Sequence, residues 1–265
     1  MKRPRHQVMY ALHRGRLLAL TLPPPEAEVL AGVPWGCFDV LLTPAFWAGR
    51  DWLHRLDPLY SATRLGSTLR EEVVACLLGG YGIPAEVGLA AFRRLRDAGI
   101  IERSPPVGCI ARLLEQPLTV GGRQVRYRFA LQRAGYIAEC LQRLPSEPDL
   151  PVDDRSLRTL LLELPGIGPK TASWITRNLR DSDDVAILDV HVCRACTAAQ
   201  VFGADANPAR DYFKLEDRFL EFARAVSARA SHLDNVIWQT MRRIGGHVRS
   251  LLSPRIPAID MESAM

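Results

Sequence analysis

One stretch near the middle of the chain constrains the fold more than any other: Leu164 to Ile175, which reads LPGIGPKTASWI. An apolar, helix-like run from Leu157 to Leu164 leads into it, and a second helical run from Thr171 to Leu179 follows. Between them, Pro-Gly-Ile-Gly predicts a turn, because glycines adopt backbone angles that other residues resist and leave peptide N–H groups uncovered. Those N–H groups precede a helix, whose dipole favours an anion. The sequence therefore predicts a helix, a glycine hairpin and a second helix suited to holding a backbone phosphate of a nucleic acid.

A second motif follows a short acidic loop. The segment from Val185 to Val192 reads VAILDVHV, an apolar run that ends in Asp189 and leads into another predicted helix. Asp189 lies 19 positions beyond Lys170, and His191 lies two positions further on. Both Lys170 and Asp189 are therefore expected to open helices close to one another.

A hairpin lysine followed at this distance by Asp-x-His resembles the helix-hairpin-helix (HhH-GPD) DNA glycosylase superfamily. The string from Gly166 to Asn178, GIGPKTASWITRN, is similar to the bacterial and archaeal branch of its 8-oxoguanine glycosylases. The resemblance implies a mostly α fold with two helical subdomains flanking an active-site cleft, and a few short strands near the N-terminus. It also implies base excision repair of double-stranded DNA, in which the enzyme removes an oxidised purine, 8-oxoguanine, and then cleaves the abasic site as a lyase.

The chemistry of this reaction gives Lys170 and Asp189 distinct roles. Breaking an N-glycosidic bond leaves positive charge on the deoxyribose, which a carboxylate stabilises, and a neutral amine captures C1′ as a Schiff base. A helix N-terminus disfavours the protonated amine, so the position of Lys170 favours this step. The resemblance assigns the amine to Lys170 and the carboxylate to Asp189. Two alternatives stay open: Lys170 belongs to a hairpin that only holds DNA, and Asp189 is only an N-cap.

The resemblance also names residues around this pair. Gly166, Ile167, Gly168, Thr171 and His191 are expected to contact the DNA backbone, and Trp174, Asp234 and Trp238 to form the pocket for a flipped base. A buried, hydrogen-bonded role for His191 and core packing of both tryptophans remain the alternatives. Tyr81 follows a buried helix, either to fill the gap left by the flipped base or to pack locally. Basic side chains at Arg123, Arg126, Arg128 and Arg133 either touch phosphates or are solvated.

The rest of the chain divides into two expected parts. Residues 1–60 form an N-terminal segment of no assigned role that packs on the body, and residues 61–265 form the helical glycosylase domain with its helix-hairpin-helix at 157–179. Within this domain, periodicity and caps predict helices at 67–79 (capped by Ser67), 85–98, 108–115, 130–143, 215–230 and 233–244. Residues 120–125 predict a small hairpin or a tight turn. Aromatic residues between 33 and 52 either pack in the core, which their spacing favours, or stack on bases.

Composition adds few constraints. The 265 residues carry a net charge of +5, which favours a polyanionic partner only modestly. No apolar run approaches the roughly 20 residues that a bilayer requires, so we expect a cytoplasmic, nucleoid-associated protein, acting as a monomer without a cofactor. Cys193 and Cys196 form the one closely spaced cysteine pair; without a second pair, core packing is favoured over a metal site. Two functional alternatives remain: a monofunctional glycosylase for another modified base, and a non-catalytic DNA-binding protein.

Overall fold

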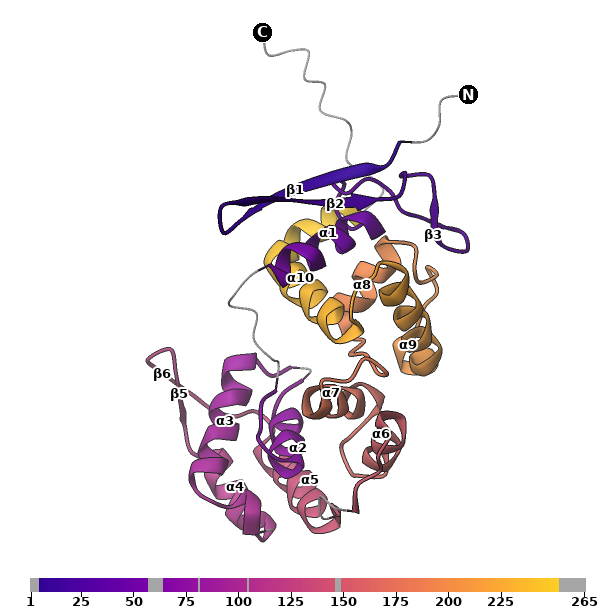
Figure 1. The fold of residues 1–265 in the computed structure, drawn as a ribbon. Coiled ribbons are helices and arrows are strands. Elements are labelled where there is room, and N and C mark those ends of the chain that lie inside the picture. Colours follow the sequence, from indigo (N-terminus) through magenta and orange to yellow (C-terminus); the bar gives the residue numbers. More distant parts are fainter. Residues whose placement is uncertain (1–4, 57–63, 81, 104, 146–148, 253–265) are drawn as a thin grey trace. The chain divides into compact units, whose positions relative to one another are not determined.

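In the computed structural model, residues 5–56, 64–80, 82–103, 105–145 and 149–252 are described, with side chains described to residue 244. This part of the chain contains ten α-helices, one 3-10 helix and three two-stranded antiparallel sheets (Figure 1). The predicted mostly α fold with short N-terminal strands is therefore confirmed. Within the described residues, no helix combines the length and apolarity needed to cross a membrane.

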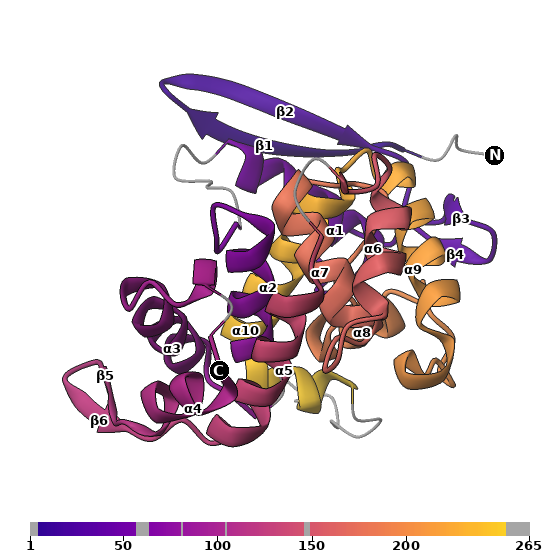
Figure 2. The same cartoon turned by 90° about the horizontal axis from the view of Figure 1, so that it is seen from below.

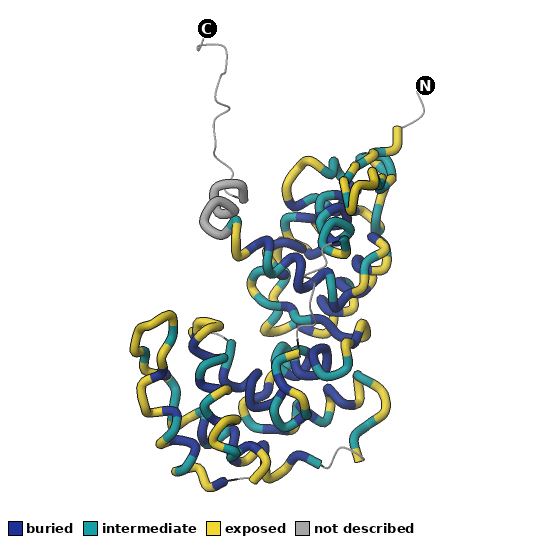
Figure 3. Tube along the Cα trace, turned by 60° about the vertical axis from the view of Figure 1, so that its left-hand side comes forward, coloured by how far each residue is buried: buried dark blue, intermediate teal, exposed yellow. Residues whose placement is uncertain are grey.

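The chain forms two compact units. A central unit comprises residues 59–187, and a terminal unit combines residues 1–58 with residues 188–265. The N-terminal segment therefore packs in the same unit as the last three helices, while the middle of the sequence forms its own core. In each unit the buried residues lie along the helices, as the dark blue positions of Figure 3 show.

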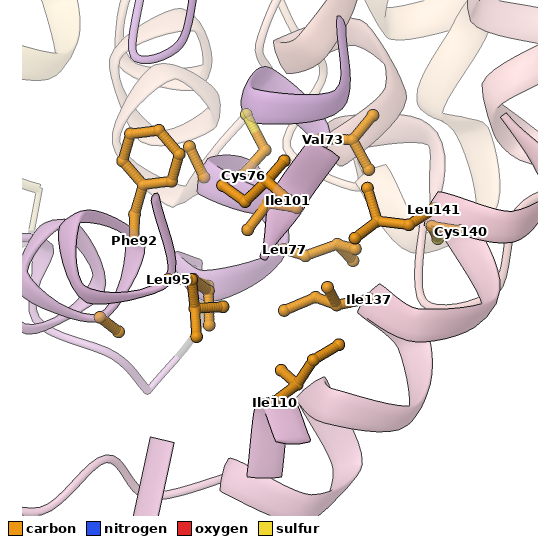
Figure 4. Close-up of a cluster of buried hydrophobic side chains, with 14 of the residues drawn as sticks. Val73, Cys76, Leu77, Phe92, Leu95, Ile101, Ile110, Ile137, Cys140 and Leu141 are labelled. Atoms are coloured by element: carbon orange, nitrogen blue, oxygen red, sulfur yellow. The ribbon is translucent and has the colours of Figure 1, made fainter. Parts of the chain in front are cut away.

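Helix α2 (Leu69–Leu78) is the centre of the central unit, and it contacts α3 (Ala85–Asp97), α5 (Ala130–Arg143) and α7 (Pro169–Arg180). The other elements of this unit are η1 (Ile101–Arg103), α4 (Val107–Glu115), β5 (Leu118–Val120), β6 (Arg123–Val125) and α6 (Asp154–Leu162). Figure 4 shows Leu77 of α2 among Leu95, Ile110 and Ile137 from three neighbouring helices. An apolar run without a polar face predicts a buried helix, and α2 confirms this.

The start of α2 corrects the predicted N-cap. Thr68, not Ser67, is the N-cap, and its hydroxyl accepts the N–H of Glu71 at 3.2 Å. Ser67 instead donates its own N–H to the Glu71 carboxylate, so it lies one residue outside the helix. Glu72, on the first turn of the helix, is fully buried. The local sequence offers two adjacent cap candidates, and tertiary contacts select between them.

The terminal unit contains β1 (Gln7–His13), β2 (Arg16–Leu22), β3 (Glu28–Leu30), β4 (Val33–Pro34), α1 (Pro44–Arg55), α8 (Val190–Ala198), α9 (Pro208–Ala225) and α10 (Ala230–Leu252). Helix α10 packs against α1 and α8 (Figure 1). Trp35 and Trp47 are buried, which confirms core packing for these two aromatic residues.

The predicted bounds of the last two helices were wrong. Helix α9 begins at Pro208, because Asn207 caps it and proline suits a first helical position. The apolar pattern that suggested a start at Leu215 becomes regular only after Asp211, where the backbone departs from helical angles (φ −119°). Helix α10 extends beyond the predicted bounds at both ends.

Candidate active site

The predicted glycine hairpin joins α6 to α7. Gly166 has a φ of +76°, and a Cβ atom added to it would lie 2.4 Å from Cδ2 of Tyr136 on α5. Only glycine satisfies both the backbone angle and this close approach. The Ile167 side chain is buried, and its N–H donates to the Leu164 carbonyl at 3.3 Å. The hairpin is thus fixed to the core of the central unit on one side.

The other side of the hairpin faces outward at Gly168. This residue is exposed, a Cβ atom there would meet nothing within 4 Å, and it is the N-cap of α7. No side chain caps this helix, and Pro169 takes its first position. The N–H groups of a first helical turn have no partners within the helix. An uncapped N-terminus of this kind is suited to binding an anion, and a phosphate in particular.

Lys170 is the second residue of α7 and is half-buried. Its Nζ lies 6.0 Å from the centre of the Trp174 ring, one helical turn further on. Trp174 packs on Gly79 at the end of α2, where an added Cβ would lie 3.0 Å from Cη2 of the ring. The structure therefore brings two predicted site residues, Lys170 and Trp174, onto one face of α7. Thr171, the next residue after Lys170, is also half-buried.

A buried polar cluster positions α7 on α2, and the sequence interpretation missed it. Asn178 donates its side-chain N–H to Oε1 of Glu72 at 2.6 Å, while Oε2 accepts the N–H groups of Leu65 and Gly66 at 3.0 and 2.7 Å. Burial raises the pKa of the Glu72 carboxyl. This carboxyl joins the segment that enters the central unit, α2 and the helix that carries Lys170. The sequence signal for this cluster was the position of Glu72 directly before the apolar run of α2.

Asp189 belongs to the terminal unit and is the N-cap of α8. Its Oδ1 accepts the N–H groups of His191 and Val192, each at 2.8 Å. The preceding residue, Leu188, donates its N–H to the hydroxyl of Tyr212 on α9 at 3.3 Å. These bonds confirm that Asp189 opens a helix, and they hold its carboxyl in one orientation. His191 is half-buried beside it.

Asp234 and Trp238, the other two predicted pocket residues, lie one turn apart on α10. Asp234 is buried, with 1% of its surface exposed, whereas Trp238 is half-buried. The guanidinium of Arg242 lies 4.6 Å from the centre of the Trp238 ring. A stacked arginine on this ring was not predicted, although a basic residue four positions beyond a tryptophan is a readable signal.

Two further predictions concern Tyr81 and the cysteine pair. Tyr81 lies outside the described residues. Cys193 and Cys196 are both on α8, and burial, with the Asp189 carboxylate adding to it, raises the pKa of the Cys193 thiol to about 12. Among the described residues, no group of three or more His, Cys, Asp and Glu side chains could hold a metal ion.

The fold is helical and contains an uncapped glycine hairpin, with a lysine in the first turn after it and a capping aspartate further along the chain. These features are those of the helix-hairpin-helix DNA glycosylases. Within this class the chain belongs to the 8-oxoguanine DNA glycosylase family, whose family model matches residues 61–228. Membership of this family associates the chain with DNA repair and DNA binding. The predicted family resemblance is thereby confirmed.

Solved structures agree with this family. The chain is 26% identical to the 8-oxoguanine DNA glycosylase of Thermotoga maritima, with a TM-score of 0.52, over 66% of this chain and 79% of that one. It is also 26% identical to the 8-oxoguanine DNA glycosylase of Methanocaldococcus jannaschii, with a TM-score of 0.52, over 67% and 78% of the two chains. A structure of the M. jannaschii 8-oxoguanine glycosylase/lyase in complex with a 15mer DNA containing 8-oxoguanine shares the fold at 21% identity and a TM-score of 0.54, over 76% and 89%.

Proposed function

We propose that this chain removes 8-oxoguanine from duplex DNA and then cleaves the abasic strand as a Schiff-base lyase. One observation carries the proposal: Lys170 is the second residue of α7, directly after an uncapped hairpin suited to a phosphate. An amine here lies beside whichever nucleotide the hairpin holds. The M. jannaschii protein that shares the fold is described as a glycosylase/lyase bound to DNA containing 8-oxoguanine, which supports the same substrate for this chain.

The proposed reaction assigns one task to each residue. The neutral amine of Lys170 attacks C1′ of the flipped nucleotide, the C1′–N9 bond breaks, and the base departs with a proton. The Asp189 carboxylate stabilises the positive charge that develops on the sugar. The C1′ adduct becomes an imine when the ring oxygen leaves with a proton. Loss of a C2′ proton then expels the 3′ phosphate, and water releases the sugar from Lys170.

The remaining site residues bind and orient the substrate. The DNA strand beside the flipped nucleotide is contacted by peptide N–H groups of the hairpin, at Gly166, Ile167 and Gly168, and by Thr171 on the next turn. His191 contacts a neighbouring phosphate. Trp174, Asp234 and Trp238 receive the base. Trp174 is the best supported of the three, because its ring lies next to the amine that attacks the sugar.

Borohydride trapping tests the role of Lys170 sharply, because lysine is rare in this chain. Only Lys2, Lys170 and Lys214 occur among 34 basic residues. We expect wild-type protein to form a covalent adduct with duplex containing 8-oxoguanine, and Lys170→Gln to form none. Lys214→Gln, an exposed residue of α9, is the matched control and should trap as wild type does. Mass spectrometry of the trapped peptide identifies the attacking amine.

Three outcomes would contradict parts of the proposal. Base release without any adduct would indicate a monofunctional glycosylase. An adduct with abasic DNA but none with 8-oxoguanine duplex would point to a different base, which a panel of lesions would identify. DNA binding without base release, unchanged by Asp189→Asn, would leave a non-catalytic DNA-binding protein.

A further inference from the structure

The positive charge of this protein is concentrated at its N-terminal end. Residues 1–25 contain five basic residues, Lys2, Arg3, Arg5, Arg14 and Arg16, and no acidic one. These five account for the whole net charge of +5, since the other 29 lysines and arginines match the 29 aspartates and glutamates. The segment also lies outside residues 61–228, which the family model covers. Its charge is therefore a feature of this chain apart from the glycosylase domain.

Most of this segment forms the β1–β2 hairpin, whose inner face and base are attached to the terminal unit. Seven residue pairs join the strands, from Gln7 with Leu22 to His13 with Arg16. On the inner face, Met9 packs against Gly49 of α1, where an added Cβ would lie 2.8 Å from the Met9 sulfur. At the base, the Gln7 amide bonds the carbonyls of Pro23 and Gly36 at 2.8 and 2.9 Å. The hairpin is thus anchored at one end, and its turn projects beyond α1 (Figures 1 and 2).

The outer face of the hairpin is apolar and exposed. Tyr10, Leu12 and Leu17 have 62%, 76% and 70% of their surface exposed, and Leu12 pairs directly with Leu17 next to the turn. Exposed and half-buried positions alternate along β1, as expected for a strand with one covered face. A contiguous apolar face of this kind on a soluble unit indicates an interaction surface.

The turn of the hairpin carries an arginine at a position whose backbone geometry favours other residue types. Arg14 and Gly15 both have positive φ, at 48° and 74°. A two-residue hairpin turn of this kind favours Asn, Asp or Gly at its first position. Here that position holds an exposed arginine, and a second exposed arginine, Arg16, follows the turn. A strained residue kept at a projecting tip suggests function, and two arginines suggest an anionic partner.

We infer that the β1–β2 hairpin is a second DNA-binding element, which contacts duplex DNA outside the lesion site. Arg14 and Arg16 bind backbone phosphates, and the outer face of Tyr10, Leu12 and Leu17 lies against base edges. The major groove admits a two-stranded β-ribbon, and its thymine methyl groups accept apolar side chains. Membership of a DNA glycosylase family favours DNA over an anionic membrane as the partner. The inference depends on DNA as the partner, and not on the base removed or on the lyase step.

The test compares the affinity of four proteins for undamaged duplex across a range of salt concentrations. The hairpin variant carries Arg14→Gln and Arg16→Gln, and a second variant carries Leu12→Ser and Leu17→Ser. The control carries Arg93→Gln and Arg112→Gln, two exposed arginines of α3 and α4, and loses the same charge. Loss of two phosphate contacts should lower the slope of log affinity against log salt by about 2 and weaken binding roughly 10- to 100-fold at 0.1 M salt. The control should keep the wild-type slope, and the leucine variant should bind more weakly with an unchanged slope.

Each alternative has its own outcome. The inference would be overturned if wild type and the arginine variant had the same slope of log affinity against log salt. It would also be overturned if the arginine variant and the control lost the same amount of DNA affinity. A dimer in sedimentation that disappears in the leucine variant would mean that a second copy covers this face. Binding to vesicles containing phosphatidylserine, with unchanged affinity for DNA, would mean that the partner is a membrane. None of these results bears on base release or on the trapped adduct, which are assayed separately.

Discussion

Replacing Gly166 by alanine should destabilise the central unit, because two independent costs meet at this residue. At a φ of +76°, alanine adopts a left-handed conformation that costs about 1 kcal/mol. Its Cβ would also lie 2.4 Å from Cδ2 and 2.7 Å from Cγ of Tyr136. These atoms are the near side of the ring, so the side chain must move as a whole to give room. Overpacking of this kind costs about 1–3 kcal/mol.

The two costs sum to about 3 kcal/mol, which corresponds to a fall in melting temperature of roughly 6–12 °C for a chain of this size. Thermal unfolding followed by circular dichroism measures it. Gly168→Ala is the matched control, because Gly168 has a φ of −95° and open space around it. Its cost should stay below about 1 kcal/mol, the range for exchanging an N-cap residue.

A double mutant separates the two costs. Tyr136→Ala in the Gly166→Ala background removes the ring that the new methyl group meets, but not the backbone strain. The pair should therefore be less destabilised than the sum of the single variants by about 1–3 kcal/mol. Strict additivity of the two substitutions would refute the steric account of the hairpin. So would a Gly166→Ala protein whose melting temperature lies within about 2 °C of the wild-type value.

Two further predictions concern buried groups. Burial raises the pKa of the Asp51 carboxyl to about 6, although its ion pair with Arg55 acts in the opposite direction. Because the folded protein binds this proton more tightly than the unfolded chain, the added stability is present below about pH 4 and is lost as the pH rises through 6. Relative to Asp51→Asn, wild type should lose about 2 kcal/mol of unfolding free energy between pH 4 and 7 in urea titrations, and parallel curves would contradict this. Tyr127 donates its hydroxyl to the Leu78 carbonyl at 2.8 Å inside the core. Tyr127→Phe should therefore cost about 1–2 kcal/mol, whereas Tyr10→Phe on the exposed hairpin should cost nothing measurable.

Local signals in the sequence predicted the elements that depend on neighbouring residues. Helix α5 has the predicted bounds, and Asp189 is the N-cap of α8. Caps succeed because an aspartate side chain reaches only the N–H groups two or three residues ahead. The i, i+4 spacing of Lys170 and Trp174 likewise predicted their shared face, because a helix repeats every 3.6 residues. For the same reason, the glycine hairpin was readable without any structure.

What only the tertiary structure decided depends on residues far apart in the sequence. The close approach of Tyr136 explains why Gly166 is glycine, and the bond from Asn178 to Glu72 joins side chains 106 positions apart. Neither contact can be paired from local sequence, although Glu72 before an apolar run marks one half of the second contact. Helix α1 packs on α10 and strand β3 contacts α9, although the glycosylase motif lies between them in the sequence. The sequence by itself determined the glycine hairpin and the place of Lys170 on the helix that follows it. Long-range packing determined what holds that helix in place.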